Sequence, residues 1–340
     1  MIKMINDNSE KLTSRINDGH GFTSRSVGQV SASTITPNNY LTCIDSSTVV
    51  RHSPEGSLLR RGDIVLKINE KTIQSLKDSI TPLIPSSNER FTNRIFNDHI
   101  FVSMIRNVCE MTVMRNQQVI TFHEPRKIIP DSAFISSSQS NPISPDIYYL
   151  NLGKLKTKEL PDILDRLNNY KGVIIDIRNG YPVDMGFVIP HYCFETQELC
   201  YSMVTEADFS HPGAFYKKEN TSRHPDELWQ ERKEFTGKKI LLINEIIMSA
   251  GETWVLLFRL SGFKLIGTPT AGANGRIKSF PLPGYNLTAN FSGMGFYYPN
   301  GEQMQRIGII PDIEVYPTMD DIMAGRDEVL EAAIKYLNSE

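Results

Sequence analysis

Ser249 is the residue of this sequence whose surroundings best suit nucleophilic chemistry. It follows an apolar, strand-like run over 241–247, and an apolar helical pattern that includes Trp254 and Val255 begins directly after it. A hydroxyl at such a turn lies over backbone N–H groups that have no acceptor within the helix, at its positive end. Such groups stabilise a nearby oxyanion, so this turn could hold a serine nucleophile.

The alternative is a serine that only caps the helix. Ser249-Ala250-Gly251-Glu252 matches the capping box, in which the serine accepts from the N3 amide and the glutamate accepts from the N–H of the cap residue. A cap of this kind contributes about 1 kcal/mol. The stretch also departs from the G-x-S-x-G elbow, because Ile247 occupies the first glycine position. The local sequence leaves both interpretations open.

Composition narrows the class of protein. The chain has 340 residues, and its 36 Lys and Arg nearly balance its 39 Asp and Glu. This balance gives no reason to expect a nucleic-acid partner. No apolar run has the length of a membrane-spanning helix, and the first residues lack the apolar stretch of a signal peptide. Four cysteines without C-x-x-C spacing predict neither a metal site nor a disulfide framework.

The elements that must position Ser249 form an α/β pattern from residue 147 onward. Short apolar strands alternate with helical segments, which favours a largely parallel, layered sheet. We expect strands at 147–153, 171–178, 238–246 and 263–268, and helices at 157–169 and 249–261.

The preceding part of the chain differs in texture. Residues 1–18 have the pattern of the end of a polar helix, and 24–124 alternate short β-rich runs with turns. Within that region we expect a helix over 88–107 and a hairpin that turns near Asn116. Residues 125–146 are rich in Pro and Ser, which predicts a linker or surface loop.

Several stretches together resemble the carboxyl-terminal processing peptidases, or tail-specific proteases, and their tricorn-core-like relatives. The resemblance extends over about residues 12–338, and its texture is that of the large group of such proteins in gut-type Bacteroidetes. The motifs that carry it are "SPEGSLLRRGDIVLKINEKTI", "GVIIDIRNG", "NEIIMSAGE", "IGTPTAGANG", "LPGYNLTANFSGMGFYYPNGEQMQRIGIIPDIEVYPT" and "GRDEVLEAAIKYL".

The resemblance implies a mixed α/β (α+β) protein with an N-terminal PDZ-like domain and a ClpP/crotonase-like β-β-α catalytic core. It implies hydrolysis of a protein or peptide substrate by Ser249, without metal or organic cofactor, in the cell envelope. The oligomeric state stays open. The expected division is a helical end with the Asp-Gly-His motif, a PDZ-like domain, a linker and a catalytic core, over 1–23, 24–124, 125–146 and 147–340.

The resemblance also implies a base for Ser249. Processing peptidases usually take a lysine from a Thr-x-Gly-Lys-like motif, but that position here holds Ala273. The tricorn-like branch takes a histidine from the segment before the PDZ domain, and "INDGHGFTS" places His20 there. A histidine suits this role because its ordinary pKa of about 6.5 lies near working pH. We therefore expect His20 to be the general base.

The group that orients His20 is not settled by the motifs. Tricorn-like members have a glutamate shortly before a Gly-x-x-Pro-Asp segment, where this chain has Gln305. A glutamine can accept from an imidazole N–H but adds no negative charge. Asp18 is the nearest anionic candidate, and it could equally cap the turn at Gly19.

The family's oxyanion donors correspond to the Ala250 amide and to an amide of the loop after "DIRN". Family members usually have paired glycines in that loop, whereas this chain has Gly180 followed by Tyr181 and Pro182. Proline offers no N–H, so Gly180 is the expected donor. The departures at Pro182 and Gln305 motivate a second hypothesis, a peptide-binding protein with weak or lost catalysis. Crotonase-like acyl chemistry is a third, and the PDZ-like segment argues against it.

Overall fold

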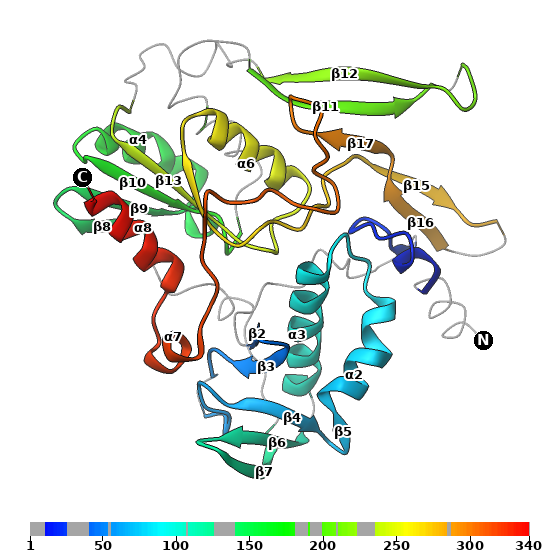
Figure 1. The fold of residues 1–340 in the computed structure, drawn as a ribbon, viewed down its shortest axis with the longest axis vertical. Coiled ribbons are helices and arrows are strands. Elements are labelled where there is room, and N and C mark those ends of the chain that lie inside the picture. Colours follow the sequence, from blue (N-terminus) through cyan, green and yellow to red (C-terminus); the bar gives the residue numbers. More distant parts are fainter. Residues whose placement is uncertain are drawn as a thin grey trace. The chain divides into compact units, whose positions relative to one another are not determined.

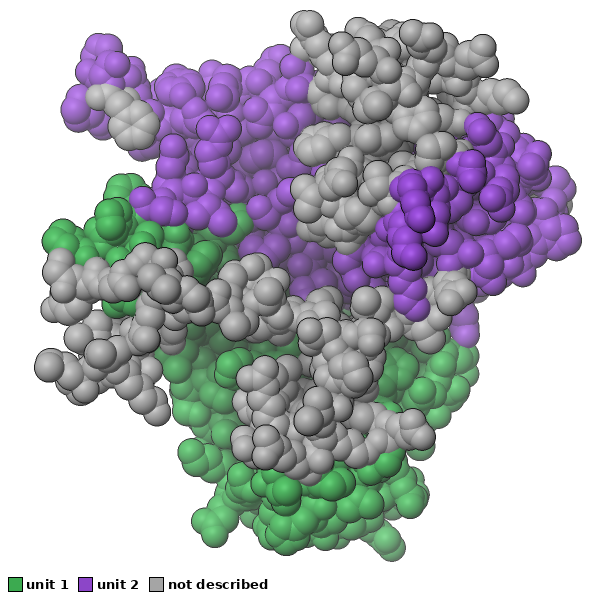
Figure 2. Space-filling model, turned by 180° about the vertical axis from the view of Figure 1, so that it is seen from behind, with its two compact units in different colours: residues 1–136, 280–290, 316–328 green, residues 137–279, 291–315, 329–340 purple. Residues whose placement is uncertain are grey.

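A computed structural model describes residues 11–25, 41–53, 56–106, 108–125, 140–180, 190, 199–208, 210–222, 235–283 and 287–339. The chain divides into two compact units, coloured separately in Figure 2. Unit 1 comprises residues 1–136, 280–290 and 316–328, and unit 2 comprises 137–279, 291–315 and 329–340. The predicted boundaries are continuous along the chain, whereas two later segments of the chain belong to unit 1.

Unit 2 is built on a six-stranded sheet (Figure 1) of the order β18-β14-β13-β10-β9-β8. Its neighbouring strands pair in parallel, except that β8 is antiparallel to β9. Strands β9 and β10 are buried at every residue, as expected for a parallel sheet covered on both faces. The strands are β8 (Asn141–Ser144), β9 (Ile147–Asn151), β10 (Gly172–Asp176), β13 (Lys238–Ile243), β14 (Lys264–Gly267) and β18 (Ile313–Glu314).

Helices cover both faces of this sheet. Alternate residues of a strand point to opposite faces, so Leu241 joins one apolar cluster and Ile240 joins another. The first cluster includes residues of α4 (Leu160–Leu167) and α6 (Ala250–Leu260), and the second includes Ala333 of α8 (Glu328–Asn338). Two 3-10 turns, η4 (Leu152–Lys154) and η5 (Thr157–Glu159), lead into α4.

The helix α6, which follows Ser249, is enclosed on all sides. A second sheet of the order β12-β11-β17 contributes Val204 and Phe296 to the same cluster as Trp254 of α6. Every residue of α6 from 251 to 258 is buried, which explains why this helix is apolar all round. The strands of this sheet are β11 (Leu199–Ala207), β12 (Phe215–Ser222) and β17 (Met294–Tyr297).

Unit 1 contains a sheet of the order β2-β3-β4-β6-β7, with β5 paired to β4. The hairpin β6–β7 turns at Asn116 and Gln117, which both have positive φ as a two-residue hairpin turn requires. The elements are β2 (Leu41–Ile44), β3 (Ser47–Val50), β4 (Ile64–Ile68), β5 (Lys71–Thr72), α2 (Ile73–Ile80), η2 (Thr81–Leu83), α3 (Glu89–Arg106), β6 (Cys109–Arg115) and β7 (Gln118–Glu124).

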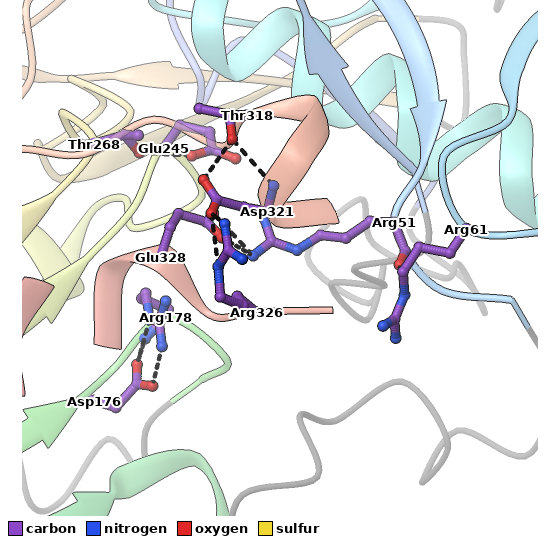
Figure 3. A network of polar contacts seen from close by, with 10 residues as sticks. All are labelled: Arg51, Arg61, Asp176, Arg178, Glu245, Thr268, Thr318, Asp321, Arg326 and Glu328. Carbon is purple, nitrogen blue, oxygen red and sulfur yellow. Dashed lines mark hydrogen bonds and ion pairs between the residues drawn. The ribbon is translucent and has the colours of Figure 1, made fainter. Parts of the chain in front are cut away.

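Two segments distant in sequence complete unit 1. Strand β1 (Thr23–Arg25) pairs antiparallel with β16 (Leu287–Ser292). The other neighbour of β16 in this three-stranded sheet is β15 (Ile277–Pro281). The second segment carries α7 (Met319–Ala324), and Arg51 binds both carboxylate oxygens of Glu328 at 2.9 and 3.1 Å. Figure 3 shows this pair beside the cluster of Thr318, Asp321 and Arg326.

The mixed α/β class predicted from the sequence is confirmed, as are the predicted helices α3 and α6 and the predicted strands β9, β10, β13 and β14. The predicted linker over 125–146 is wrong at 141–144, which form β8; residues 126–139 lie outside the described part. Pro142 fits this strand because an edge strand tolerates proline. No helix in the described part of the chain combines the length and apolarity needed to span a bilayer.

Candidate active site

Ser249 occupies the N-cap of α6 in an unusual backbone conformation. Its φ is 54° and its ψ is −125°, a combination that costs a residue with a side chain about 1–3 kcal/mol. Its hydroxyl makes no capping hydrogen bond. The cap interpretation of the Ser249 hydroxyl is therefore wrong for this conformation, because the positive φ turns the side chain away from the N3 amide. The side chain is half-buried.

The side chain of Glu252 turns back toward the cap residue. The backbone N–H of Ser249 lies near the Glu252 carboxylate and acts to lower its pKa, against the effect of burial. The carbonyl of Ser249 in turn accepts from the N–H groups of Glu252 at 2.9 Å and Thr253 at 3.3 Å. The carbonyl of Ser249 is thus bonded to the first turn of the helix, while its hydroxyl makes no capping bond there.

Ala250 is the first residue of α6, and it is exposed. No described residue accepts a hydrogen bond from its N–H, whereas the following amide, of Gly251, donates to Met248 O at 3.0 Å. An unpartnered N–H at the positive end of a helix is suited to an oxyanion. This geometry supports the predicted donor role of Ala250.

The loop after β10 carries Gly180. Gly180 has a φ of 109°, and no described atom lies within 4 Å of the place where a Cβ would stand. Its N–H makes a long hydrogen bond of 3.4 Å to the carbonyl of Ile177. To serve as an oxyanion donor, Gly180 must exchange this long bond for one to substrate, and its donor role stays a prediction. Tyr181 and Pro182 lie outside the described residues.

A buried ion pair fixes the start of that loop. Asp176 is 1% exposed, and it accepts from Arg178 Nε at 3.0 Å and Nη2 at 2.7 Å, as Figure 3 shows, and from Tyr149 Oη at 2.8 Å. Asn244, directly after β13, donates from Nδ2 to the carbonyl of Arg178 at 3.1 Å. Asn244 therefore joins the loop that carries Gly180 to the loop that carries Ser249.

Glu252 connects the nucleophile turn to a third segment, 270–273. Its carboxylate accepts from Thr270 Oγ1 at 2.5 Å and from the amides of Gly272 at 2.7 Å and Ala273 at 2.9 Å. Glu252 is fully buried, and this burial raises the pKa of its carboxyl to about 7, although the hydrogen bonds act in the opposite direction. Ala273, which stands where the family has its lysine, thus contributes a backbone N–H to the bonds of Glu252.

Gln305 lies in unit 2 with its amide bonded to backbone groups. Its Oε1 accepts from the N–H of Phe296 at 3.1 Å, and its Nε2 donates to the carbonyls of Asn274 at 2.6 Å and Met294 at 3.0 Å. These bonds give Gln305 a structural function in unit 2. Its orienting role toward His20 stays a prediction.

His20 belongs to unit 1 and is 3% exposed. Asp18 Oδ1 accepts from the backbone N–H of His20 at 2.9 Å and lies 4.0 Å from His20 Nδ1. The first contact makes Asp18 the cap of this turn. The second exceeds a hydrogen-bond distance but leaves a charge interaction. Burial lowers the pKa of His20 below its ordinary value, and the Asp18 charge partly offsets this.

The sequence analysis did not identify Glu252 and Asn244 as residues of the site. Glu252 enters those predictions only as a helix cap, although an acidic residue in the otherwise apolar start of α6 is a signal that it has a buried partner. Asn244 has no such signal, since its contact depends on the neighbouring strand. In the described part of the chain, no group of three or more His, Cys, Asp or Glu could hold a metal ion.

Comparisons with known proteins show what this chain is similar to. Residues 193–315, which include Ser249, match the model of peptidase family S41. A candidate peptidase from Parabacteroides merdae ATCC 43184 is 25% identical with a TM-score of 0.50; the match covers 57% of this chain and 62% of that one, less than two thirds. Mature CPAF complexed with lactacystin is 12% identical with a TM-score of 0.64, over 96% of this chain and 86% of that one.

Residues 193–315 thus form a region similar to the serine-type peptidases of family S41. The family match over residues 193–315 agrees with the resemblance to the C-terminal processing peptidases in the sequence. The similarity to CPAF shows a shared fold. No curated protein sequence matches the chain.

Proposed function

We propose that the protein is a serine endopeptidase that cleaves protein tails or unfolded polypeptides, with Ser249 as the nucleophile and His20 as the general base. The observation that supports this most is the Ser249 turn, where the hydroxyl is not used by the helix and the adjacent Ala250 N–H has no acceptor among the described residues. Strained backbone of this kind persists at sites where function requires it.

The proposed reaction follows the acyl-transfer pattern. Ser249 Oγ attacks the scissile carbonyl carbon while its proton passes to the neutral imidazole of His20, on the nitrogen away from Asp18. The carbonyl oxygen becomes an oxyanion that accepts from Ala250 N–H and from Gly180 N–H. His20 then gives its proton to the leaving amine, and water releases the acyl group from Ser249 by the same route.

The electrostatics of His20 suit a base. Burial lowers its pKa, so that the imidazole is neutral and able to accept a proton at pH 7. The nearby Asp18 charge stabilises the imidazolium that forms during attack. His20 and Ser249 belong to different units, so the proposal requires the units to bring the two side chains together.

The PDZ-like function of unit 1 is part of this proposal. PDZ domains bind an extended peptide as an added strand, and β2 stands at the edge of the sheet formed by the described strands of unit 1. An added strand there would capture an unfolded segment for cleavage. Residues 26–40, which precede β2, lie outside the described part.

Labelling with a fluorophosphonate probe, followed by intact-mass measurement, tests the proposal. The wild-type protein should gain one probe, Ser249→Ala should gain none, and His20→Ala should react slower by about 10²–10⁴-fold. His211→Ala is the matched control, because His211 is exposed and also contacts an aspartate, Asp208. Labelling that survives Ser249→Ala would contradict the assignment. A wild-type protein that binds unfolded peptides but takes up no probe would favour the peptide-binding hypothesis.

A further inference from the structure

Glu252 is placed where a capping residue alone has no need to be buried. It is 0% exposed, in the buried first turn of a helix, and its carboxylate receives three donors from the segment 270–273. A solvent-exposed glutamate would cap the helix without the cost of removing a carboxylate from water. The burial of Glu252 therefore indicates a function that the cap does not account for.

The function concerns the backbone conformation of Ser249. A residue in a sparsely populated conformation stays there only when its surroundings determine it on several sides. The N–H of Ser249 lies near the Glu252 carboxylate, and the carbonyl of Ser249 accepts from the Glu252 N–H at 2.9 Å. Glu252 thus binds the peptide group after the Ser249 Cα and lies near the peptide group before it.

The same carboxylate fixes the segment 270–273 against the turn. Thr270 Oγ1 donates to Glu252 and accepts from the Ile309 N–H at 2.7 Å, which extends the connection to a fourth segment. The Ala271 N–H donates to the Ile247 carbonyl at 2.9 Å, two residues before Ser249. The turn that carries Ser249 is therefore bonded to the segment 270–273, both through the Glu252 carboxylate and through the Ile247 carbonyl.

We propose that Glu252 is a positioning residue that holds Ser249 in its strained backbone conformation and sets the direction of the Ser249 hydroxyl. This inference rests on the proposed function of Ser249. It assigns Glu252 no contact with substrate and no proton transfer. A glutamine at this position has nearly the same size as glutamate and keeps one acceptor oxygen. Its NH2 group would face N–H and O–H groups that are themselves donors, so the bonds that fix the Ser249 turn would be lost.

Kinetics of Glu252→Gln test this role. We expect kcat for a peptide substrate to fall by about 10²-fold while KM changes less than about twofold, because misplacement of a reacting group affects the chemical step. Thr270→Val removes one donor from the same carboxylate and should lower kcat by a smaller factor, with the fold retained. An unchanged kcat in both variants, measured on folded protein, would overturn the proposal. If Glu252→Gln does not fold, Thr270→Val decides the question.

A stability cycle tests the same idea without any catalysis. Ser249→Gly removes the backbone strain, since glycine adopts positive φ freely. If Glu252 maintains that strain, Glu252→Gln should lower the thermal midpoint more in the Ser249→Gly protein than in the wild type, because only the wild type regains strain energy when its turn relaxes. Asp312→Asn is the matched control, because Asp312 also accepts a backbone N–H in unit 2, that of Leu265, and its effect should be the same in both backgrounds.

The two tests separate failure of this inference from failure of the proposed function. Additive midpoint shifts for Ser249→Gly and Glu252→Gln would show that Glu252 does not hold the strained turn, whatever the activity of the protein. A non-additive cycle in a protein that takes up no fluorophosphonate would support the hold on Ser249, while the peptidase function itself would be withdrawn.

Discussion

The turn at His20 and the turn at Ser249 use the same device in different surroundings. In each, a carboxylate within three residues lies beside the backbone N–H of the candidate catalytic residue. Asp18 accepts from the N–H of His20, and Glu252 lies near the N–H of Ser249. The Asp18 side chain keeps 12% of its exposure, whereas Glu252 is fully buried. Asp18 can act on the imidazole by charge as well as by capping, while Glu252 acts on Ser249 only through the backbone.

Burial has opposite effects on the pKa values of His20 and Glu252, and these effects suit different functions. Burial disfavours the charged form of both His20 and Glu252, so it lowers the pKa of the first and raises the pKa of the second. For a base this is useful, because a neutral imidazole can accept a proton. For a carboxylate that holds backbone amides it is a cost, which the surrounding donors only partly offset.

The largest expected effect concerns whether the two turns act as one unit. Ser249→Ala and His20→Ala should each lower kcat by roughly 10⁴–10⁶-fold, and the double variant should lose no more than Ser249→Ala alone, because groups of one catalytic unit are not additive. Steady-state kinetics of the three variants measure this. Losses that multiply in the double variant would mean that His20 acts independently of Ser249.

The pH dependence of stability tests the burial of Glu252. The pKa of Glu252 is higher in the folded than in the unfolded protein. The stability that follows from this difference is fully present below pH 4.5 and is lost as the pH rises to about 7. The free energy of unfolding of the wild type, relative to Glu252→Gln, should fall across this window by up to about 3 kcal/mol. Denaturant titrations at pH 4.5, 6 and 7.5 measure the difference. A difference that does not change with pH would contradict this account.

Gln305→Glu tests the alternative orienting group. The new carboxylate would face the carbonyls of Asn274 and Met294, so at pH 7 the free energy of unfolding should fall by about 1–3 kcal/mol. The loss should shrink at low pH, where a protonated carboxyl can donate. A gain in both stability and kcat at pH 7 would instead show that position 305 accepts a charge that serves His20.

The smallest expected effect is a shift of the acid limb of kcat/KM. This limb reports the base of the free enzyme, and burial of His20 places it below pH 6.5. Asp18→Asn removes the charge that raises the pKa of His20, so the limb should move to lower pH. Asp208→Asn, beside the exposed His211, should leave it unchanged. A shift to higher pH would exclude Asp18 as the charge partner.

The sequence allowed much of the fold of unit 2 to be predicted, because its strands are continuous apolar runs and its helices have clear periodicity. It failed at Asn141–Ser144, where a proline on an edge strand has the composition of a loop. It could not indicate that residues 280–290 and 316–328 belong to unit 1, because such contacts depend on tertiary packing rather than on local pattern.

The candidate site was predictable where a motif marks a residue and unpredictable where only a contact does. Ser249 and Ala250 were singled out by an apolar run followed by a helical pattern, although β13 ends at Ile243 and a short turn leads to α6. The positive φ of Ser249 does not, because serine rarely adopts it and only the network around Glu252 enforces it. Asn244 was missed for a similar reason, since its partner is a carbonyl on a different loop.

The enclosure of α6 between two sheets has a consequence for how the nucleophile can move. A helix covered on every side cannot fray or slide without opening the hydrophobic core of unit 2. Amide protons of Trp254, Val255 and Leu257 should therefore exchange with deuterium only through global unfolding. The nucleophile would then owe its fixed position to the stability of its whole unit, and any adjustment to substrate would have to come from the loops in front of it.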